Sequence, residues 1–78
     1  MVAVVVERVV VDPKVLRGKP VIKGTRIPVY LILELLAAGM SIKDILREYP
    51  ELREEDVRAA LDYASKLLKQ EIVLPLEA

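Results

Sequence analysis

The segment at residues 18–29, GKPVIKGTRIPV, restricts the fold of this chain more than any other stretch. Glycine accepts positive φ, whereas proline fixes φ and donates no backbone hydrogen bond, so the two glycines and two prolines limit how the backbone can run. Lys23-Gly24 predicts a tight turn between two short strand arms, Val21-Ile22 and Arg26-Ile27. Pro28 then suits the first turn of a helix. The segment therefore predicts a β-hairpin that leads directly into a helix.

The glycines of this segment also invite comparison with a phosphate loop, which requires the spacing G-x-x-x-x-G-K-[ST]. Five residues separate Gly18 from Gly24, and Thr25 rather than lysine follows the second glycine. We therefore interpret Gly18 and Gly24 as turn residues. Phosphate binding by their backbone amides is the less favoured alternative.

The chain begins with a valine-rich stretch. Residues 2–11 are mostly valine, interrupted by Glu7 and Arg8, and Asp12-Pro13 follows. Branching at Cβ suits a pleated strand and restricts χ1 in a helix, so we expect a strand here. Because an unpaired strand of this kind promotes aggregation, we expect it to be paired, with a second copy of the chain as one candidate partner.

Three helical patterns follow the hairpin. The first covers residues 28–38, and Gly39 suits its left-handed C-terminal cap. Ser41 begins the second, with Asp44 at the reciprocal position of a capping box, and Pro50 ends it. The third begins near Glu54. Its first turn is acidic, which favours the positive end of a helix dipole, and its predicted buried face consists of Val57, Ala60, Leu61, Ala64, Leu67 and Leu68.

These elements predict one mainly α domain with a small β part, over residues 1–78. We divide it into an N-terminal strand and β-hairpin (1–27), a three-helix bundle of the helix-turn-helix type (28–70) and an extended tail (71–78). The apolar fraction is 54%, although ordinary globular domains contain about 45–50% even with glycine included. A chain of 78 residues buries only part of its surface, so we expect the excess to be covered by a homodimer partner.

Composition also bears on location and chemistry. The chain has no cysteine, which fits a cytoplasmic protein, and no apolar run is long enough for a membrane helix. It also has no histidine, and the acids Glu54, Glu55 and Asp56 fan around a helix start instead of converging on one point. We therefore expect no enzymatic activity, no metal site and no cofactor.

Charge is distributed unevenly although the net charge is zero. Residues 13–27, which we call the basic segment, contain five cations and no acid. Three interpretations remain for these cations: solvated charge that protects a hairpin edge, contact with nucleic-acid phosphate, and contact with a protein partner. The nucleic-acid-binding candidates along the chain are Arg17, Lys19, Lys23, Arg26, Arg53 and Arg58.

The stretches VVVDPKVLRGKPVIKGTRIPV and ILELLAAGMSIKDILREYPELREEDVRAALDYA resemble those of a known family. The chain is identified as a member of the small prokaryotic domain-of-unknown-function 433 family, related to VapB-like antitoxins, on the signature G-K-P-V-I-x-G-T-R-I-P-V. The resemblance implies a homeodomain-like DNA- or RNA-binding fold, usually dimeric. Many members look like antitoxins whose toxin is a PIN-like ribonuclease. One departure is Arg53, which stands where relatives often have a Ser or Thr cap before the third helix.

Together, the residues and the resemblance predict an antitoxin-like protein that neutralises a PIN-like ribonuclease, with operator DNA as a further candidate ligand. The alternatives are a DNA-binding transcriptional regulator without a toxin, and a homodimeric scaffold without a nucleic-acid role. The acidic start of the third helix argues against base readout by that helix, because carboxylates are repelled by phosphate. The apolar tail either folds onto its own core or binds a partner. Its partner-binding candidates are Ile72, Val73, Leu74 and Leu76.

Overall fold

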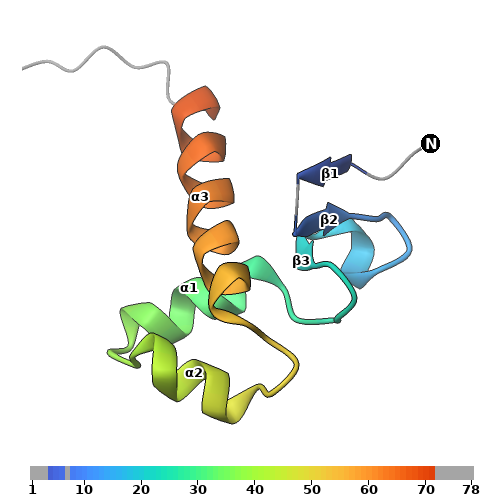
Figure 1. Cartoon of the computed structure of the whole chain (residues 1–78). Helices are drawn as coiled ribbons and strands as arrows, with labels where there is room; N and C mark the ends of the chain where they lie inside the picture. The colour runs from blue at the N-terminus through green and yellow to red at the C-terminus, as the bar shows by residue number, and fades with distance from the viewer. Residues whose placement is uncertain (1–3, 7, 72–78) are drawn as a thin grey trace, which may run out of the picture.

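The computed structural model describes residues 4–6 and 8–71. Within these ranges the order of elements is β1 (Val4–Val6), β2 (Val9–Val11), a 3-10 turn (Leu16–Gly18), β3 (Val21–Ile22), α1 (Val29–Ala37), α2 (Ile42–Glu48) and α3 (Glu54–Glu71) (Figure 1). The predicted fold class, mainly helical with a small β part, is confirmed. Among the described helices, none combines the length and hydrophobicity needed to cross a membrane.

The valine-rich stretch forms two strands, and the prediction of a single strand over residues 2–11 is wrong. β1 pairs with β2 in antiparallel register, with Val5 opposite Val10, and β2 pairs with β3, with Val9 opposite Ile22. The sheet order is therefore β1-β2-β3. The reversal between β1 and β2 was missed because the run contains no glycine, asparagine or proline to mark a turn. β2 finds both of its partners within one chain, so its pairing needs no second copy.

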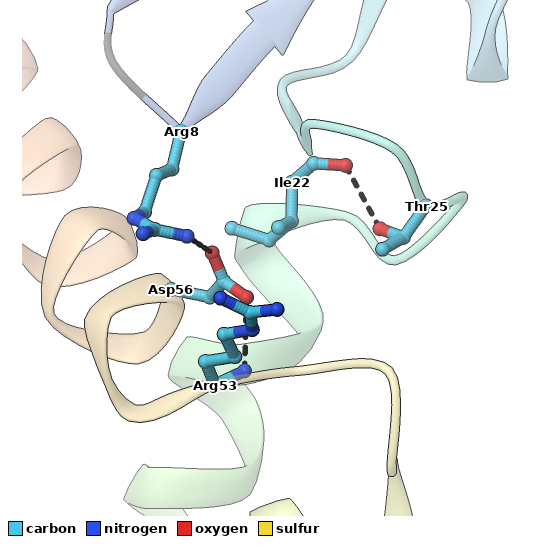
Figure 2. Close-up of polar contacts among 5 residues, drawn as sticks. All are labelled: Arg8, Ile22, Thr25, Arg53 and Asp56. Atoms are coloured by element: carbon cyan, nitrogen blue, oxygen red, sulfur yellow. Dashed lines mark hydrogen bonds and ion pairs between the residues drawn. The ribbon is translucent and has the colours of Figure 1, made fainter.

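The predicted hairpin is present only in part. Gly24 takes a φ of 82° in the turn after β3, but residues 26 and 27 form no strand. Instead the Thr25 hydroxyl donates to the Ile22 carbonyl at 2.8 Å (Figure 2). The same hydroxyl accepts from the Ile27 N–H at 3.0 Å, and the two bonds close the turn locally. Only an isolated bridge, Val21 to Pro28, continues the ladder. The side chain of Thr25 thus replaces a regular second arm.

α1 begins one residue later than the sequence predicts. Pro28 is its N-cap, with an extended ψ of 151°, and the helix starts at Val29. At the other end Gly39 has a φ of 100° and donates its N–H to the Leu36 carbonyl, while the Met40 N–H donates to the Leu35 carbonyl. This pair of bonds is a Schellman motif, which requires the left-handed conformation that glycine accepts.

α2 carries the reciprocal cap that its sequence predicts. The Asp44 N–H donates to the Ser41 Oγ at 3.1 Å, and the Ser41 N–H donates to the Asp44 Oδ2 at 3.3 Å. Hydrogen bonding by the Ser41 side chain, and then by its backbone N–H, lowers the pKa of Asp44; desolvation partly opposes this shift, and the charge of Arg47 makes the smallest contribution to it. The N-terminal cap of α2 is therefore formed by two residues that lie three positions apart in sequence.

One hydrophobic core joins the sheet to the three helices. Val9 and Ile22 come from the sheet, Ile32 from α1, Ile45 from α2 and Val57 from α3, and all five are essentially inaccessible to solvent. Figure 1 shows the sheet on one side of α3, with α1 and α2 gathered at its base. The N-terminal half of α3 is thus the element around which the other parts pack.

The C-terminal half of α3 extends past α1 and α2 (Figure 1). Val57 and Ala60 are buried as predicted, but Leu61, Leu67 and Leu68 remain 43%, 42% and 56% exposed. The predicted buried face of α3 is therefore correct only for its first turns. Apolar residues continue at helical spacing towards the C-terminal end of α3, where the described part of the chain does not bury them. α3 also runs to Glu71, one residue beyond the predicted bundle, and residues 72–78, including the four apolar tail candidates, lie outside the described residues.

Candidate functional site

Asp56, in the first turn of α3, is buried and makes two strong contacts (Figure 2). Its Oδ1 accepts from Nη1 of Arg8 at 3.1 Å, and its Oδ2 accepts from the backbone N–H of Arg53 at 2.9 Å. The second contact is the reciprocal half of a capping box, supplied although Arg53 has no capping side chain of its own. Arg8 immediately precedes β2, so one carboxylate ties the sheet to the start of α3.

Sequence reasoning placed Asp56 among three surface acids and did not foresee this contact. The signal available was an aspartate three residues after a position that lacks a Ser or Thr cap, a spacing that fits the reciprocal bond. The partner Arg8 is 48 residues away in sequence, and no local pattern points to it.

The remaining charges at the start of α3 nearly balance. Glu54 pairs with Arg58 at 2.9 Å, one helical turn apart, while Arg53 and Glu55 are exposed. Arg58, a predicted nucleic-acid contact, is therefore engaged within its own helix. α3 contacts β2, and Arg8, the residue before β2, reaches Asp56 in the first turn of α3. The exposed residues at this helix start, Arg53, Glu54 and Glu55, carry no excess of the positive charge that favours contact with DNA phosphate.

The basic segment presents its cations to solvent. Arg17, Lys19, Lys23 and Arg26 are all exposed, and none of them takes part in an ion pair within the described part of the chain. Arg17 and its neighbour Leu16 have φ values of 57° and 48°, in the left-handed region that non-glycine residues rarely adopt. Gly18 continues this turn with a φ of 84°. The left-handed turn holds the start of the segment in a compact conformation at the surface.

Beside the basic segment, α1 and α3 enclose an apolar groove. Its volume is about 210 Å³, and it is lined by Lys19, Pro20, Val29, Tyr30, Leu33, Tyr63, Ala64 and Leu67. Tyr30 remains 48% exposed, and the Lys19 ammonium lies over its ring at 5.7 Å from the centroid. A cation at this distance from an aromatic face is attracted by the ring. The groove thus has apolar walls and one charged residue, Lys19, at its edge.

The size of the groove limits what it can hold. Sites for drug-sized ligands and cofactors measure roughly 300–1,000 Å³, larger than this one. One or two apolar side chains fit the space better, as in the anchoring contacts of protein interfaces. Among the described residues, no three acidic side chains gather in an arrangement that would hold a metal ion.

Comparison with known proteins gives the family. The model of the family described as "Protein of unknown function (DUF433)" matches residues 9–64. The chain belongs to this family. The match includes the basic segment, Asp56 and most of the groove. The matched region therefore contains the basic segment and every groove residue except Leu67, and it contains Asp56 but not its partner Arg8.

Relatives of this DUF433 chain come from bacteria and an archaeon. It is 43% identical over 58 residues to "Uncharacterized protein y4eO" of Sinorhizobium fredii, an alignment that covers 74% of this chain and 26% of that protein. It is 83% identical over 23 residues to an "Uncharacterized protein" of Archaeoglobus fulgidus, over 30% of this chain and 64% of the other.

A solved structure shares the fold. The crystal structure of a DUF433 member from Anabaena variabilis superposes with a TM-score of 0.75 at 33% identity, covering 81% of this chain and 62% of that one. Each of these matches spans less than two thirds of the relative.

Proposed function

We propose that this chain is an antitoxin-like protein that binds a PIN-like ribonuclease through the groove between α1 and α3. The observation that carries the proposal is the apolar groove itself, with Tyr30 and Leu67 each about half exposed at its edges. Fully burying a large apolar side chain contributes about 1.5–3 kcal/mol, so covering the exposed halves of two such residues contributes about 2 kcal/mol. The nature of the partner comes from the family resemblance.

The charged rim adds specificity to this contact. Lys19 lies over the ring of Tyr30, at the edge of the cavity that an apolar anchor would fill. A partner segment that combines an apolar side chain with a neighbouring carboxylate would match both features. Such a charge at the rim improves selectivity and association rate more than affinity.

The proposal is tested by co-purification with a PIN-like nuclease, taken from the neighbouring gene where that gene encodes one. Leu67→Glu places a charge in the groove wall, and Tyr30→Ala removes half-exposed apolar surface; both should abolish or sharply reduce capture. Ser65→Glu is the matched control, because it adds the same charge to the same turn of α3 on the opposite side of the helix. Circular dichroism checks that all three variants fold. Undiminished capture by both groove variants would remove the groove from this role.

The tail at residues 72–78 is a second candidate contact in the same proposal. A chain ending at residue 71 should lose capture if the tail binds the nuclease, while its helical spectrum stays unchanged. Full capture by the shortened chain would assign binding to the described part of the molecule. The two sets of variants therefore separate the tail from the groove.

A second candidate function is the binding of operator DNA by the basic segment. The observation in its favour is that four exposed cations lie together in sequence without an internal ion pair in the described structure. Helix-turn-helix readout by the first turn of α3 is disfavoured, because Asp56 in that turn is bound to Arg8 and the exposed charges of the turn nearly cancel. Contact with phosphate would therefore come mainly from the basic segment.

This second function is tested by the salt dependence of binding to the DNA upstream of the gene. Lys23→Gln with Arg26→Gln should weaken binding and reduce the slope of log K against log salt by about one for each lost phosphate contact. Neither residue lines the groove, so nuclease capture should be unaffected. Arg47→Gln, which removes an exposed cation from α2, serves as the control. An unchanged slope in the double variant would exclude this surface.

A further inference from the structure

We propose that the groove between α1 and α3 is filled in the free protein by the chain's own residues 74–77, with Leu74 and Leu76 inside it and Glu77 beside Lys19. A protein that binds the groove must then displace this segment. The contact concerns this chain alone, whereas its effect on nuclease binding rests on the function proposed above.

The groove fits a short apolar segment that carries one acid. Its volume is about 210 Å³, which accommodates one or two apolar side chains. Among the described residues that line it, Lys19 is the only charged one, and its ammonium lies over the Tyr30 ring at the edge. A carboxylate at this edge is attracted by the ammonium, and a second cation is repelled. Charge complementarity therefore favours an acidic occupant.

Residues 74–77, Leu-Pro-Leu-Glu, have this composition. Pro75 fixes its own φ and disfavours helical backbone at Leu74, so the sequence favours an extended segment here. In an extended segment, residues two apart point to the same side, so Leu74 and Leu76 can enter the groove together. Glu77 then follows them at the edge. The two leucines and the acid match the apolar walls and the single cation.

The segment also starts close to the groove. Leu67, which lines the groove, lies four residues before Glu71, where α3 ends, so the two are about 6 Å apart along the helix axis. Tyr63, another lining residue, lies about 12 Å from that end. An extended chain advances about 3.3 Å per residue. If residues 72 and 73 reverse the chain, residues 74–77 can therefore run back past Leu67 towards Tyr63.

The other exposed apolar surface of α3 suits this segment less well. Leu61 and Leu68 are 43% and 56% exposed, and neither lines the groove. A side chain inserted in the groove has walls from two helices, α1 and α3, whereas a leucine laid on Leu68 would remain partly in water. The larger apolar area removed from water favours the groove.

Attachment to α3 makes even a weak contact effective. As a free peptide, a segment with two anchoring leucines should bind with a dissociation constant on the order of 1 mM. A short flexible connection supplies an effective concentration of about 1–10 mM, so the groove should be filled in roughly half to nine tenths of the molecules. The segment should therefore weaken the binding of any other groove ligand by about two- to tenfold.

The contact is tested by paramagnetic NMR on the full chain, which contains no cysteine of its own. Ala78→Cys carries a nitroxide label next to Glu77. The label should broaden the resonances of Leu33 and Tyr63 in the groove and leave those of Ile42 in α2 unchanged. Nitroxide-bearing chains mixed with isotope-labelled chains that lack the nitroxide should cause no broadening, because the contact lies within one molecule.

Two double variants of the labelled chain separate binding from tethering. Leu74→Ser with Leu76→Ser should remove most of the groove broadening. Ile72→Ser with Val73→Ser is the matched control, because it removes two apolar side chains from the same tail outside the proposed contact, and it should keep the broadening. Equal broadening of the groove in both would reflect tethering alone and overturn the proposal. Broadening of Leu61 and Leu68 without Leu33 would overturn it too, because the tail would then lie on the exposed face of α3.

Charge reversal tests the contact between Lys19 and Glu77. Lys19→Glu places two carboxylates side by side and should reduce the groove broadening. Adding Glu77→Lys restores opposite charges and should restore the broadening. A reversed pair that behaves like Lys19→Glu alone would overturn the position given to Glu77.

The effect on nuclease binding is measured separately with the same double variants, without the label. Leu74→Ser with Leu76→Ser should bind the nuclease about two- to tenfold more tightly than the wild type, and the control should bind like the wild type. Weaker binding would mean that the tail itself contacts the nuclease and would overturn the competition. Groove broadening with unchanged nuclease binding would support the tail contact and remove the groove from the proposed nuclease function.

Discussion

Replacing Asp56 by alanine should destabilise the protein more than the loss of any other acid in the described structure. The carboxylate is buried and accepts two hydrogen bonds, from Arg8 and from the backbone N–H of Arg53. Asp56→Ala removes both and leaves an N–H at the start of α3 without this partner. The perturbation therefore acts on the sheet and on the helix start together.

The magnitude follows from the surroundings of each bond. The Arg8 side chain is 40% exposed, so solvent screens the ion pair and its contribution is about 0.5–1 kcal/mol. The bond to Arg53 is charge-assisted and caps a helix, which contributes about 1–2 kcal/mol. The expected loss is therefore about 1.5–3 kcal/mol. In a domain of this size, each kcal/mol lowers Tm by about 4–8 °C, so the melting temperature should fall by at least about 6 °C.

The assay is thermal and urea unfolding followed by circular dichroism at one fixed protein concentration. Asp56→Asn keeps an oxygen for the Arg53 N–H but loses the charge, so it should cost less than Asp56→Ala. Glu55→Ala is the control, because it removes an exposed acid from the same turn and should cost about 0.5 kcal/mol or less.

A double-mutant cycle isolates the bond between the sheet and the helix. Arg8→Met retains the apolar stem of the arginine, and the cycle of this change with Asp56→Ala should give a coupling energy of about 1 kcal/mol. A coupling energy near zero, or an Asp56→Ala variant as stable as the control, would refute the reasoning.

Three further changes test the local contacts of the fold. Because the pKa of Asp44 is lowered, its carboxylate stabilises the folded state at pH values above the usual pKa of 3.8, and this stabilisation is lost as the pH falls through the folded pKa. In urea unfolding, the wild type should therefore be more stable than Asp44→Asn near neutral pH, and the difference in unfolding free energy should vanish at acid pH. Gly39→Ala should cost about 1 kcal/mol in thermal unfolding, purely from its φ of 100°, since no atom lies within 4 Å of the new Cβ. Thr25→Val removes two hydrogen bonds and should lower the unfolding free energy by about 1–2 kcal/mol in the same assay. Thr25→Ser keeps the hydroxyl and should lower it less. Equal losses in the two variants would show that the hydroxyl does not stabilise the turn.

Local patterns predicted the helical part of the fold well. Ser41 with Asp44 and Gly39 after α1 each depend on residues within a few positions of one another, and the observed bonds have the expected partners. Such contacts can be inferred from sequence because the backbone geometry of a helix end fixes which neighbours meet.

Contacts between distant residues were not predictable in the same way. The pairing of β1 with β2 lacked any turn residue, and Arg8 lies far from Asp56 in sequence. The exposure of Leu68 was also missed, because helical periodicity shows which residues share a face but not how far the rest of the molecule covers that face. The groove between α1 and α3 depends on the crossing of two helices, so its lining became evident only in three dimensions.

The position of Lys19 has a consequence for any ligand of this protein. Its ammonium lies over the Tyr30 ring at the edge of the groove and also belongs to the exposed cations of residues 13–27. An anion that recruits this side chain and a protein segment that inserts beneath it therefore compete for one group. Two ligands that each need this ammonium would therefore weaken one another's binding by the same factor.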